Sequence, residues 1–192
     1  ANTFCEGTLT AKIETHSYSL FGQLDYDLTD QWTFILGIRG IREKKDYDYN
    51  SRLYLNTRDE RVDGEPYAGG VPFTALFTGG APFEFLLPHQ ESVSYYLWSG
   101  KVQLNYEWND DLLLYFGINR GVKAGSFNSP LLTTLTSDQY FYKPEILVSF
   151  EGGFKSTFWD GKARLNGSAF YYDYSDYQAF QFIGTSGAVF NA

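Results

Sequence analysis

The side chains best suited to bind a small molecule are arginines and aromatic residues in the least regular stretches of the sequence. Arg52, Arg58 and Arg61 lie in or beside one such stretch. Their guanidinium groups can form charge-assisted hydrogen bonds to an anionic ligand. Alternatively they are solvated loop residues, because Asp59 and Glu60 lie next to them. The arginines are therefore candidate anion contacts that share their loop with acidic residues.

Aromatic side chains form a second set of candidates. Four of them lie in a segment rich in glycine and proline, and two lie near the end of the last regular pattern. Such residues can form an aromatic shelf for a ligand or pack the loop against itself, and both interpretations stay open. The candidate aromatic contacts are Tyr67, Phe73, Phe77, Phe83, Tyr172 and Tyr174.

The sequence contains no arrangement typical of catalysis or metal binding. His16 and His89 are far apart, and no carboxylates accompany them in a ligand pattern. The single cysteine, Cys5, cannot close an internal disulfide, and no Cys/His spacing suggests zinc. The glycine-rich stretches lack the spacing of a phosphate-binding loop. We therefore predict neither an enzyme nor a resident metal or cofactor.

The composition favours strands and excludes a nucleic-acid partner. The 192 residues include 16 Tyr, 17 Phe, 4 Trp and 19 Gly, which favour strands and turns over helices. The formal net charge is −8, whereas a phosphate-binding surface needs clustered Lys and Arg. The one basic cluster, residues 42–45, is followed at once by acidic residues, so we interpret it as a solvated strand end or loop.

The chain repeats one pattern three times: a strand with alternating polar and apolar residues, a very short turn, and a second such strand. In the first repeat, about residues 9–49, Tyr18, Leu20, Leu24 and Tyr26 alternate with polar residues. The turn is residues 28–31. Upstream, Leu9, Ala11 and Ile13 have the opposite parity. We expect a β-bulge near residues 15–17 to restore a common face.

The other two repeats follow the same rule. The second, about residues 93–124, turns at residues 109–111. The third, about residues 144–183, turns at Asp160-Gly161, a strong hairpin signal. Their apolar positions include Val102, Leu104, Tyr106, Trp108, Leu112, Leu114, Phe116, Ile118, Ile146, Val148, Phe150, Phe154, Ala163, Leu165 and Tyr171.

Long connections, about residues 50–91 and 125–142, separate the repeats, and the first runs for roughly forty residues. Alternation alone is equally typical of a soluble β-sandwich. Short turns at one end with long loops at the other favour an outer-membrane barrel, with the long loops extracellular. Aromatic residues beside the short turns also fit a membrane interface. A polar face with charges of both signs fits a hydrated lumen.

We therefore predict an all-β fold: a sector of an antiparallel transmembrane β-barrel, with about six strands in three hairpins. The sequence has no run of about 18 apolar residues that would form a membrane-spanning helix. Six strands are fewer than the roughly eight that close a membrane barrel. Open strand edges are not tolerated in lipid. We therefore expect the chain to be a piece of a larger barrel domain.

The hairpins resemble those of TonB-dependent outer-membrane receptors. The stretch SYSLFGQLDYDLTDQWTFILGIRGIREKKDY is similar to a mid-barrel hairpin of this family, and SGKVQLNYEWNDDLLLYFGINRGVKAGSFN to the next one. YKPEILVSFEGGFKSTFWDGKARLNGSAFYYDYSDYQAF resembles the hairpin after that. The resemblance implies a mid-barrel segment of a twenty-two-stranded barrel. Counterparts of the plug domain and of the C-terminal strands are not found in this sequence.

The resemblance also implies a function and a location. We expect an outer-membrane receptor of a Gram-negative bacterium for energy-coupled uptake of a scarce nutrient, foremost a ferric siderophore. The expected partners are that ligand, outer-membrane lipid, and the inner-membrane energy transducer TonB through a part of the receptor not found here. The alternatives are a passive outer-membrane porin, a barrel that scaffolds a surface complex, and a soluble carbohydrate-binding β-domain.

Overall fold

The structure is a computed structural model that describes residues 4–56, 71–72, 89–129, 139–183 and 186–192. Within these ranges, side chains are described for residues 10–50, 90–129, 139–182 and 187–192. No helix in the described ranges is long and apolar enough to cross a membrane.

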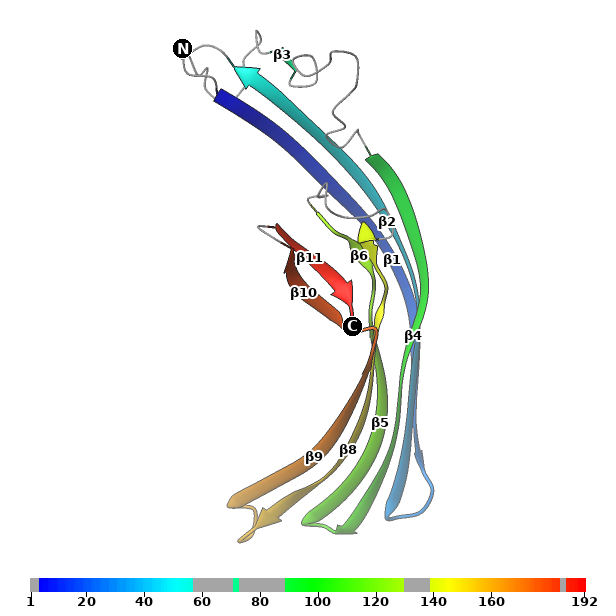
Figure 1. Cartoon of the computed structure of the whole chain (residues 1–192). Helices are drawn as coiled ribbons and strands as arrows, with labels where there is room; N and C mark the ends of the chain where they lie inside the picture. The colour runs from blue at the N-terminus through cyan, green and yellow to red at the C-terminus, as the bar shows by residue number, and fades with distance from the viewer. Residues whose placement is uncertain (1–3, 57–70, 73–88, 130–138, 184–185) are drawn as a thin grey trace.

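One curved antiparallel sheet makes up most of the structure (Figure 1). Each of its long strands pairs with the one before it, apart from the short β3. Its strands, in spatial order, are β1 (Phe4–Asp27), β2 (Trp32–Asn56), β4 (His89–Asn109), β5 (Leu112–Lys123), β8 (Glu145–Phe158) and β9 (Ala163–Ser175), and β3 (Val71–Pro72) pairs with β2. Two small sheets pair β6 (Ser126–Phe127) with β7 (Phe141–Tyr142) and β10 (Gln178–Ile183) with β11 (Ser186–Asn191).

The register gives the sheet an apolar face and a polar face. Directly paired residues lie on the same face of a sheet, so each ladder row shows the character of one face. One row consists of Leu24, Leu36, Val102, Ile118, Phe150 and Tyr171. The adjacent row, on the opposite face, consists of Gln23, Gly37, Lys101, Asn119, Ser149 and Tyr172.

The apolar face is not covered by a second sheet of described residues. Phe116 is 53% exposed and Leu20 is 83% exposed. A β-sandwich would bury these side chains between two sheets. The sandwich interpretation is therefore wrong, and the structure is one wall of a larger assembly.

The three tight turns lie together at the lower end of the sheet (Figure 1). In the first, the Thr29 hydroxyl accepts hydrogen bonds from the backbone N–H groups of Gln31 (3.2 Å) and Trp32 (3.1 Å). In the second, the Asn109 side chain accepts one from Asp111 N–H (3.0 Å). These side chains accept hydrogen bonds from backbone N–H groups of the turn that have no partner in the paired strands.

The third turn uses left-handed backbone. Trp159, Asp160 and Gly161 have φ angles of 52°, 55° and 83°. The chain reverses direction over these three residues and Lys162, whose backbone N–H donates a hydrogen bond to the carbonyl oxygen of Trp159 (3.2 Å). Asp160 tolerates this conformation better than most residues, and Gly161 carries no Cβ to oppose it. The Asp-Gly pair expected at this position thus lies within the turn.

Successive hairpins are staggered along the sheet. Trp32, the first residue of β2, pairs with Tyr106, and β4 continues past Tyr106 to Asn109. Leu112, the first residue of β5, pairs with Ser156, and β8 continues to Phe158. A sheet that closes into a barrel needs strands tilted to the barrel axis and a stagger of this kind.

The β-bulge expected near residues 15–17 is absent, so that prediction was wrong. The β1–β2 register runs without a shift from Phe4 opposite Asn56 to Asp27 opposite Thr33. Ile13 therefore lies on the otherwise polar face, where it pairs with Tyr47. The reason is that the polar and apolar faces of the sheet are reversed near its upper end. There the polar face is covered by the β6–β7 segment, and the opposite face is hydrophilic.

The covered region holds the largest buried side chains of the described structure. Tyr47 and Tyr49, on β2, and Phe127, on β6, are each less than 5% exposed. Val93 and Tyr140 pack against them. Figure 1 shows β6 and the β10–β11 hairpin on the concave side of the sheet. We call this concave surface the inner face and the opposite surface the outer face.

The third hairpin ends earlier than its alternation suggests. The β9 strand stops at Ser175, because Asp176 takes a φ of 53° and leaves the ladder. The following strand, β10, pairs with β11 and not with β8. Backbone hydrogen bonds between Tyr177 and Ala192 close the base of this small hairpin.

Candidate functional site

A line of aromatic rings runs up the inner face of β9 and continues just beyond it. Phe170 stacks on Tyr172, with ring centroids 4.6 Å apart. Tyr172 meets Tyr174 edge-on at 6.5 Å, and Tyr174 meets Tyr177 edge-on at 5.5 Å. Tyr172, Tyr174 and Tyr177 are 45–49% exposed. We call these four residues the aromatic track, and it presents both ring faces and hydroxyl groups to the inner space.

Beside and below the aromatic track, the inner face is polar. Gln103 donates a hydrogen bond to Asn105 (2.6 Å) along β4. Tyr115 on β5 donates to Glu151 on β8 (2.7 Å). A cavity of about 360 Å³ opens on this wall. Its polar lining consists of Lys101, Gln103, Asn105, Tyr115, Asn119, Glu151 and Lys155.

Three carboxamide side chains fasten the upper loops to each other and to the sheet. Asn128, only 4% exposed, donates to the carbonyl groups of Gln139 (2.9 Å) and Val189 (3.0 Å) and accepts from Val189 N–H (2.7 Å). A buried carboxamide that forms a donor and an acceptor bond with one residue acts as a substitute strand partner. Asn128 therefore joins the β6–β7 segment to β11.

Gln178 and Asn191 do the same at the base of the β10–β11 hairpin. Gln178 donates from its side chain to the carbonyl groups of Ala124 and Lys143, both at 3.0 Å. Its backbone N–H donates to Glu145 Oε2 (2.7 Å). Asn191 accepts from Lys143 N–H (2.7 Å) and donates to Lys143 O (3.1 Å). The hairpin beside the aromatic track is therefore held in place by side-chain hydrogen bonds as well as by its backbone.

The cluster of Tyr47, Tyr49 and Phe127 supports the same loops from beneath. Burial raises the pKa of Tyr47 above the usual range, an effect that nearby Ser129 partly offsets. The Tyr47 hydroxyl is buried and has no hydrogen bond of ordinary geometry among the described residues. This hydroxyl contributes little to the packing that fixes the loop.

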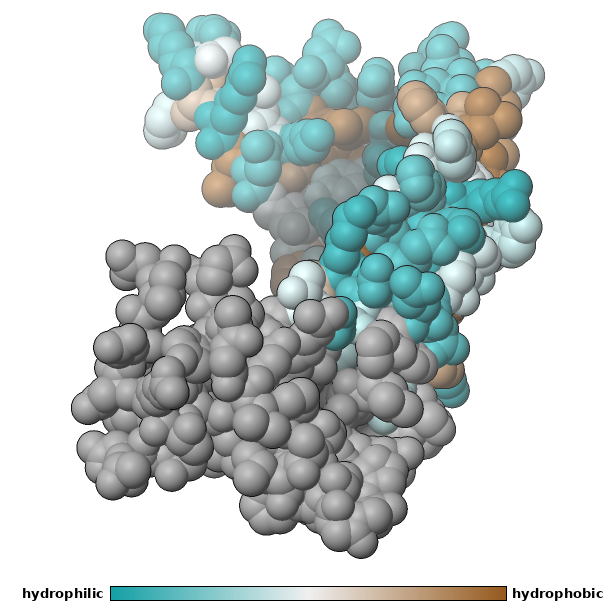
Figure 2. Space-filling model, turned by 90° about the horizontal axis from the view of Figure 1, so that it is seen from above, coloured by the Kyte–Doolittle hydropathy of each residue, from teal (hydrophilic) through white to brown (hydrophobic). Residues whose placement is uncertain are grey.

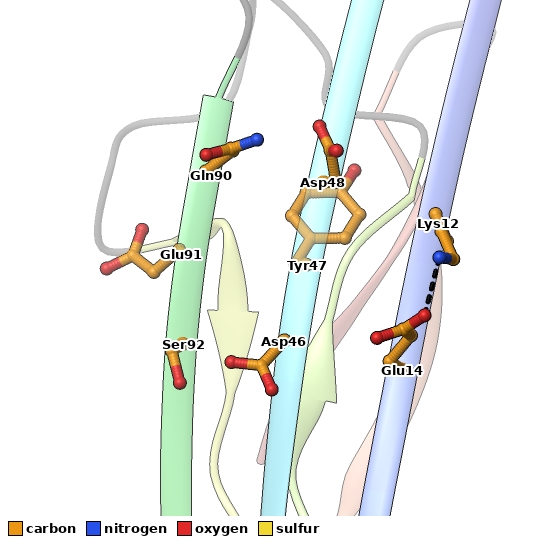
Figure 3. A pocket seen from close by; sticks show the side chains of 8 residues that line it. All are labelled: Lys12, Glu14, Asp46, Tyr47, Asp48, Gln90, Glu91 and Ser92. Carbon is orange, nitrogen blue, oxygen red and sulfur yellow. Dashed lines mark ion pairs between the residues drawn. The ribbon is translucent and has the colours of Figure 1, made fainter.

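The outer face is hydrophilic at its upper end. Figure 3 shows a groove across β1, β2 and β4, and a 2.5 Å ion pair joins Lys12 to Glu14 in it. The hydrogen bond and charge of Lys12 hold the pKa of Glu14 below its usual range, and Glu14 in turn raises the pKa of Lys12. Lys44 likewise lowers the pKa of Asp46. Seen from above, hydrophilic residues cover much of the visible described surface (Figure 2).

The basic cluster at residues 42–45 is divided between the two faces. Lys44 pairs with Asp46 at 2.7 Å on the outer face. Lys45 pairs with Glu43 at 3.2 Å on the inner face, where both side chains are largely buried. Lys44 and Lys45 are thus each paired with a carboxylate two residues away on the same strand.

The sequence-predicted ligand contacts are only partly described. Tyr172 and Tyr174 lie in the aromatic track. Arg52 lies near the upper end of β2, with its backbone opposite Thr8. The other candidates, Arg58, Arg61, Tyr67, Phe73, Phe77 and Phe83, lie outside the residues whose placement or side chains are described.

The structure also brings to the site residues that were not among the ligand contacts predicted from the sequence. Phe170 extends the aromatic track, and its position two residues before Tyr172 gives only a weak signal. Tyr177, which the sequence places with Tyr172 and Tyr174 as an aromatic candidate, continues the track beyond β9. Asn128 and Gln178 lie in the stretches that resemble hairpins of TonB-dependent receptors. That resemblance assigned no role to Gln178. Among the described residues, no group of three His, Cys, Asp or Glu side chains could hold a metal ion.

Comparison with known protein families identifies the kind of protein to which this sheet belongs. The family model described as TonB dependent receptor-like, beta-barrel, matches residues 2–192. The chain belongs to the TonB-dependent receptor family. It is a segment of the receptor's β-barrel, and the barrel lies in the outer membrane of a Gram-negative cell. The apolar part of the outer face is therefore the surface that meets the lipid, and the inner face lines the lumen.

Two solved structures of this family resemble the chain. The ferric yersiniabactin uptake receptor FyuA from Yersinia pestis matches with a TM-score of 0.66 at 17% identity, over 90% of this chain. The chain spans 22% of the FyuA chain. The alcaligin outer membrane receptor FauA from Bordetella pertussis matches at 10% identity, over 98% of this chain and 35% of that one, with a TM-score of 0.36. The first match supports the barrel fold, and the second is too weak to add to it.

Proposed function

We propose that the receptor containing this chain takes up a ferric siderophore across the outer membrane, in a step energised by TonB. The observation that carries the proposal is the aromatic track on the lumen face of β9. It gives a TonB-dependent barrel an exposed surface of rings and hydroxyl groups on which a bulky chelate with planar groups can rest.

The polar wall suits the route that such a ligand would follow. Its cavity presents amide, hydroxyl and ammonium groups and the carboxylate of Glu151. Charges of both signs keep the lumen hydrated without giving it one strong sign. A chelate released from the aromatic track would meet exchangeable hydrogen-bond partners rather than a second tight site.

Arg52, near the upper end of β2, and Arg58 and Arg61, in the sequence that follows β2, belong to this proposal as anion contacts. A ferric chelate with net negative charge would be attracted by guanidinium groups at the extracellular mouth. Tyr67, Phe73, Phe77 and Phe83 are proposed as further aromatic contacts in the same loop. These assignments rest on residue type and on the extracellular side assigned to that loop.

The test is uptake by cells that carry the full-length receptor as their only route for ferric chelates. Radioactive iron is supplied as a panel of ferric catecholate, hydroxamate and phenolate siderophores. We expect uptake of at least one member, and we expect this uptake to be lost when tonB is deleted or the proton gradient is collapsed. Uptake that persists without TonB would indicate a passive porin. Failure of every ferric chelate to enter or to bind would overturn the siderophore assignment.

A further inference from the structure

Two arginines on the outer face each lie over an aromatic ring. The guanidinium carbon of Arg120, on β5, is 4.1 Å from the centroid of the Trp98 ring. The guanidinium carbon of Arg42, on β2, is 5.6 Å from the centroid of the Tyr96 ring. Tyr96 and Trp98 are two residues apart on β4, which lies between β2 and β5. The four side chains form one surface patch, which we call the arginine–aromatic patch.

The geometry of the patch depends on a glycine. A Cβ atom at Gly100 would lie 3.3 Å from Cζ3 of Trp98. The absence of a side chain there lets the indole ring lie close to the sheet. Arg120 can then extend across the ring, and its Nη1 donates a hydrogen bond to the carbonyl oxygen of Trp98. One donor is thereby used for positioning, and the remaining guanidinium N–H groups are available to a ligand.

Neither arginine is neutralised by a carboxylate among the described residues. The ion pairs in this part of the chain involve Lys12, Lys44 and Lys45. In the ladder row of Arg120, the carboxylate Asp173 is separated from it by β8. The patch therefore combines two guanidinium groups with two exposed aromatic rings, and Tyr96 is 75% exposed.

The patch lies at the upper edge of the lipid-facing band. On β2 the outward residues from Trp32 to Gly40 are apolar, and Arg42 is the first charged one. On β5 the outward residues from Leu112 to Ile118 are apolar, and Arg120 is the first charged one. Because the short turns are periplasmic in outer-membrane barrels, this edge meets the headgroups of the extracellular leaflet.

We propose that Arg42 and Arg120 bind phosphate groups of the phosphorylated glycolipid that forms the extracellular leaflet. Guanidinium groups match phosphate through paired, charge-assisted hydrogen bonds. Tyr96 and Trp98 lie at the depth where a lipid changes from headgroup to acyl chain, a position that aromatic side chains favour. The occupant must carry an anionic head above an apolar tail, because the patch adjoins exposed apolar surface.

The neighbouring surface has room for that tail. Gly22 and Gly40 lie on the outer face of β1 and β2, and a Cβ atom added at either would meet nothing within 4 Å. Gly22 shares a ladder row with Ile38, and Gly40 shares one with Trp98. An acyl chain can therefore lie against the backbone beside the patch. This inference concerns the lipid side of the barrel and does not depend on the transported ligand.

The test measures binding of a bisphosphorylated disaccharide lipid to the full-length receptor in neutral detergent, by native mass spectrometry. Replacing Arg42 and Arg120 together with Gln should weaken binding about 30-fold, since each cation near an anionic lipid surface contributes a factor of about five. Lys44→Gln is the matched control, because Lys44 is an outward cation on β2 that already pairs with Asp46. It should leave binding within about twofold of the unmodified receptor.

Two further arms identify the phosphate as the recognised group and the lipid as its source. The same lipid without phosphates should bind the unmodified receptor about 30-fold more weakly, a comparison that holds even if the double variant fails to fold. Inorganic phosphate should not displace the lipid. Equal binding by the double variant, equal binding of the dephosphorylated lipid, or displacement by inorganic phosphate would each overturn the proposal.

Discussion

Phe127 stacks on Tyr47 with ring centroids 4.9 Å apart and ring planes inclined by 12°. This contact joins the loop between β5 and β8 to the inner face of β2. Lower on the same face, the side chains are polar and line the lumen. Packing of aromatic residues thus anchors the loop between β5 and β8 at the upper end of the sheet, next to the wall that carries the aromatic track.

Truncating Phe127 should loosen this loop and destabilise the receptor. Removal of a buried phenyl group costs about 3 kcal/mol in a well-packed site. We expect Phe127→Ala to lower the free energy of unfolding by that amount, as measured by urea unfolding of the receptor in detergent. Phe182→Ala is the control, because Phe182 is 74% exposed and its loss should change little. Equal effects of the two substitutions would contradict this account of the loop.

Tyr47 should make the receptor sensitive to alkaline pH. Burial raises the pKa of this phenol, so the folded chain holds its proton more tightly than the unfolded chain. The resulting stability is present below the ordinary tyrosine pKa of about 10 and is lost as pH rises through the folded value. Tyr47→Phe should reduce the loss of unfolding free energy between about pH 8 and pH 11. It should change stability at neutral pH by less than about 1 kcal/mol.

The exposed Tyr96 provides the matched control for this experiment. Tyr96→Phe removes the hydroxyl group of an exposed tyrosine and shows what the loss of a surface hydroxyl does to stability in the same measurement. An unchanged profile for Tyr47→Phe would show that ionisation of Tyr47 is not coupled to unfolding.

Replacing Asn128 with Asp should release β11 from the loop. The carboxylate cannot donate to the carbonyl groups of Gln139 and Val189, and it would place a charge at a buried position. We expect a loss of about 2–3 kcal/mol in local stability, seen as faster amide hydrogen exchange in residues 186–191. Gln181→Glu changes an exposed carboxamide of β10 in the same way, and exchange there should stay nearly the same. Slow exchange in the Asn128 variant would argue against the proposed clamp.

Adjacent residues on β4 offer a direct test of which face meets lipid. Val102 lies on the outer face and Gln103 on the inner face. Val102→Arg should lower the free energy of folding into phospholipid vesicles by about 2–4 kcal/mol, because it places a charge within the lipid-facing band. Gln103→Arg should have little effect in the hydrated lumen. If the inner-face change were the more damaging, the assignment of the two faces would have to be reversed.

The aromatic track should contribute to ligand binding from the inner face only. Aromatic contacts are worth about 0.5–1.5 kcal/mol each, so Tyr172→Ala with Tyr174→Ala should weaken binding of a transported ferric siderophore by about tenfold. Tyr171 is the control, since it directly precedes Tyr172 in the sequence but faces outward beside Phe150. Tyr171→Ala should leave the affinity unchanged. Comparable losses for inward and outward changes would mean that the substitutions disturb β9 rather than the site.

The sequence predicted the two-faced wall because its signal is local. In a strand, Val102 and Gln103 must point to opposite sides whatever lies around them, and turn residues such as Thr29 and Gly161 act within a few positions. The register of the long hairpins follows from those turns. The clustering of aromatic residues near the turns could likewise be predicted. Trp32 and Tyr106 are direct cross-strand partners, with ring centroids 4.4 Å apart.

The alternation of polar and apolar residues gave a wrong prediction where the surroundings of the sheet change. Leu9, Ala11 and Ile13 keep one parity along β1 through an unbroken register with β2, so the expected bulge was unnecessary. On β2, Tyr47 and Tyr49 lie on that same face in a core covered by the loop after β5. That environment is created by Phe127, which is distant in sequence and carries no periodic signal. The same holds for Asn128 bonding to Val189, and for Arg120 over Trp98. Strand order brings these pairs together, and no spacing along the chain encodes them.

The amino-acid sequence alone thus determined the strands, the turns and the division into apolar and polar faces, because backbone geometry fixes these over a few residues. Only the tertiary structure decided which amides clamp the loops and which cations meet at the lipid edge. Those contacts depend on strand register and loop position, which are set by packing between segments far apart in the chain.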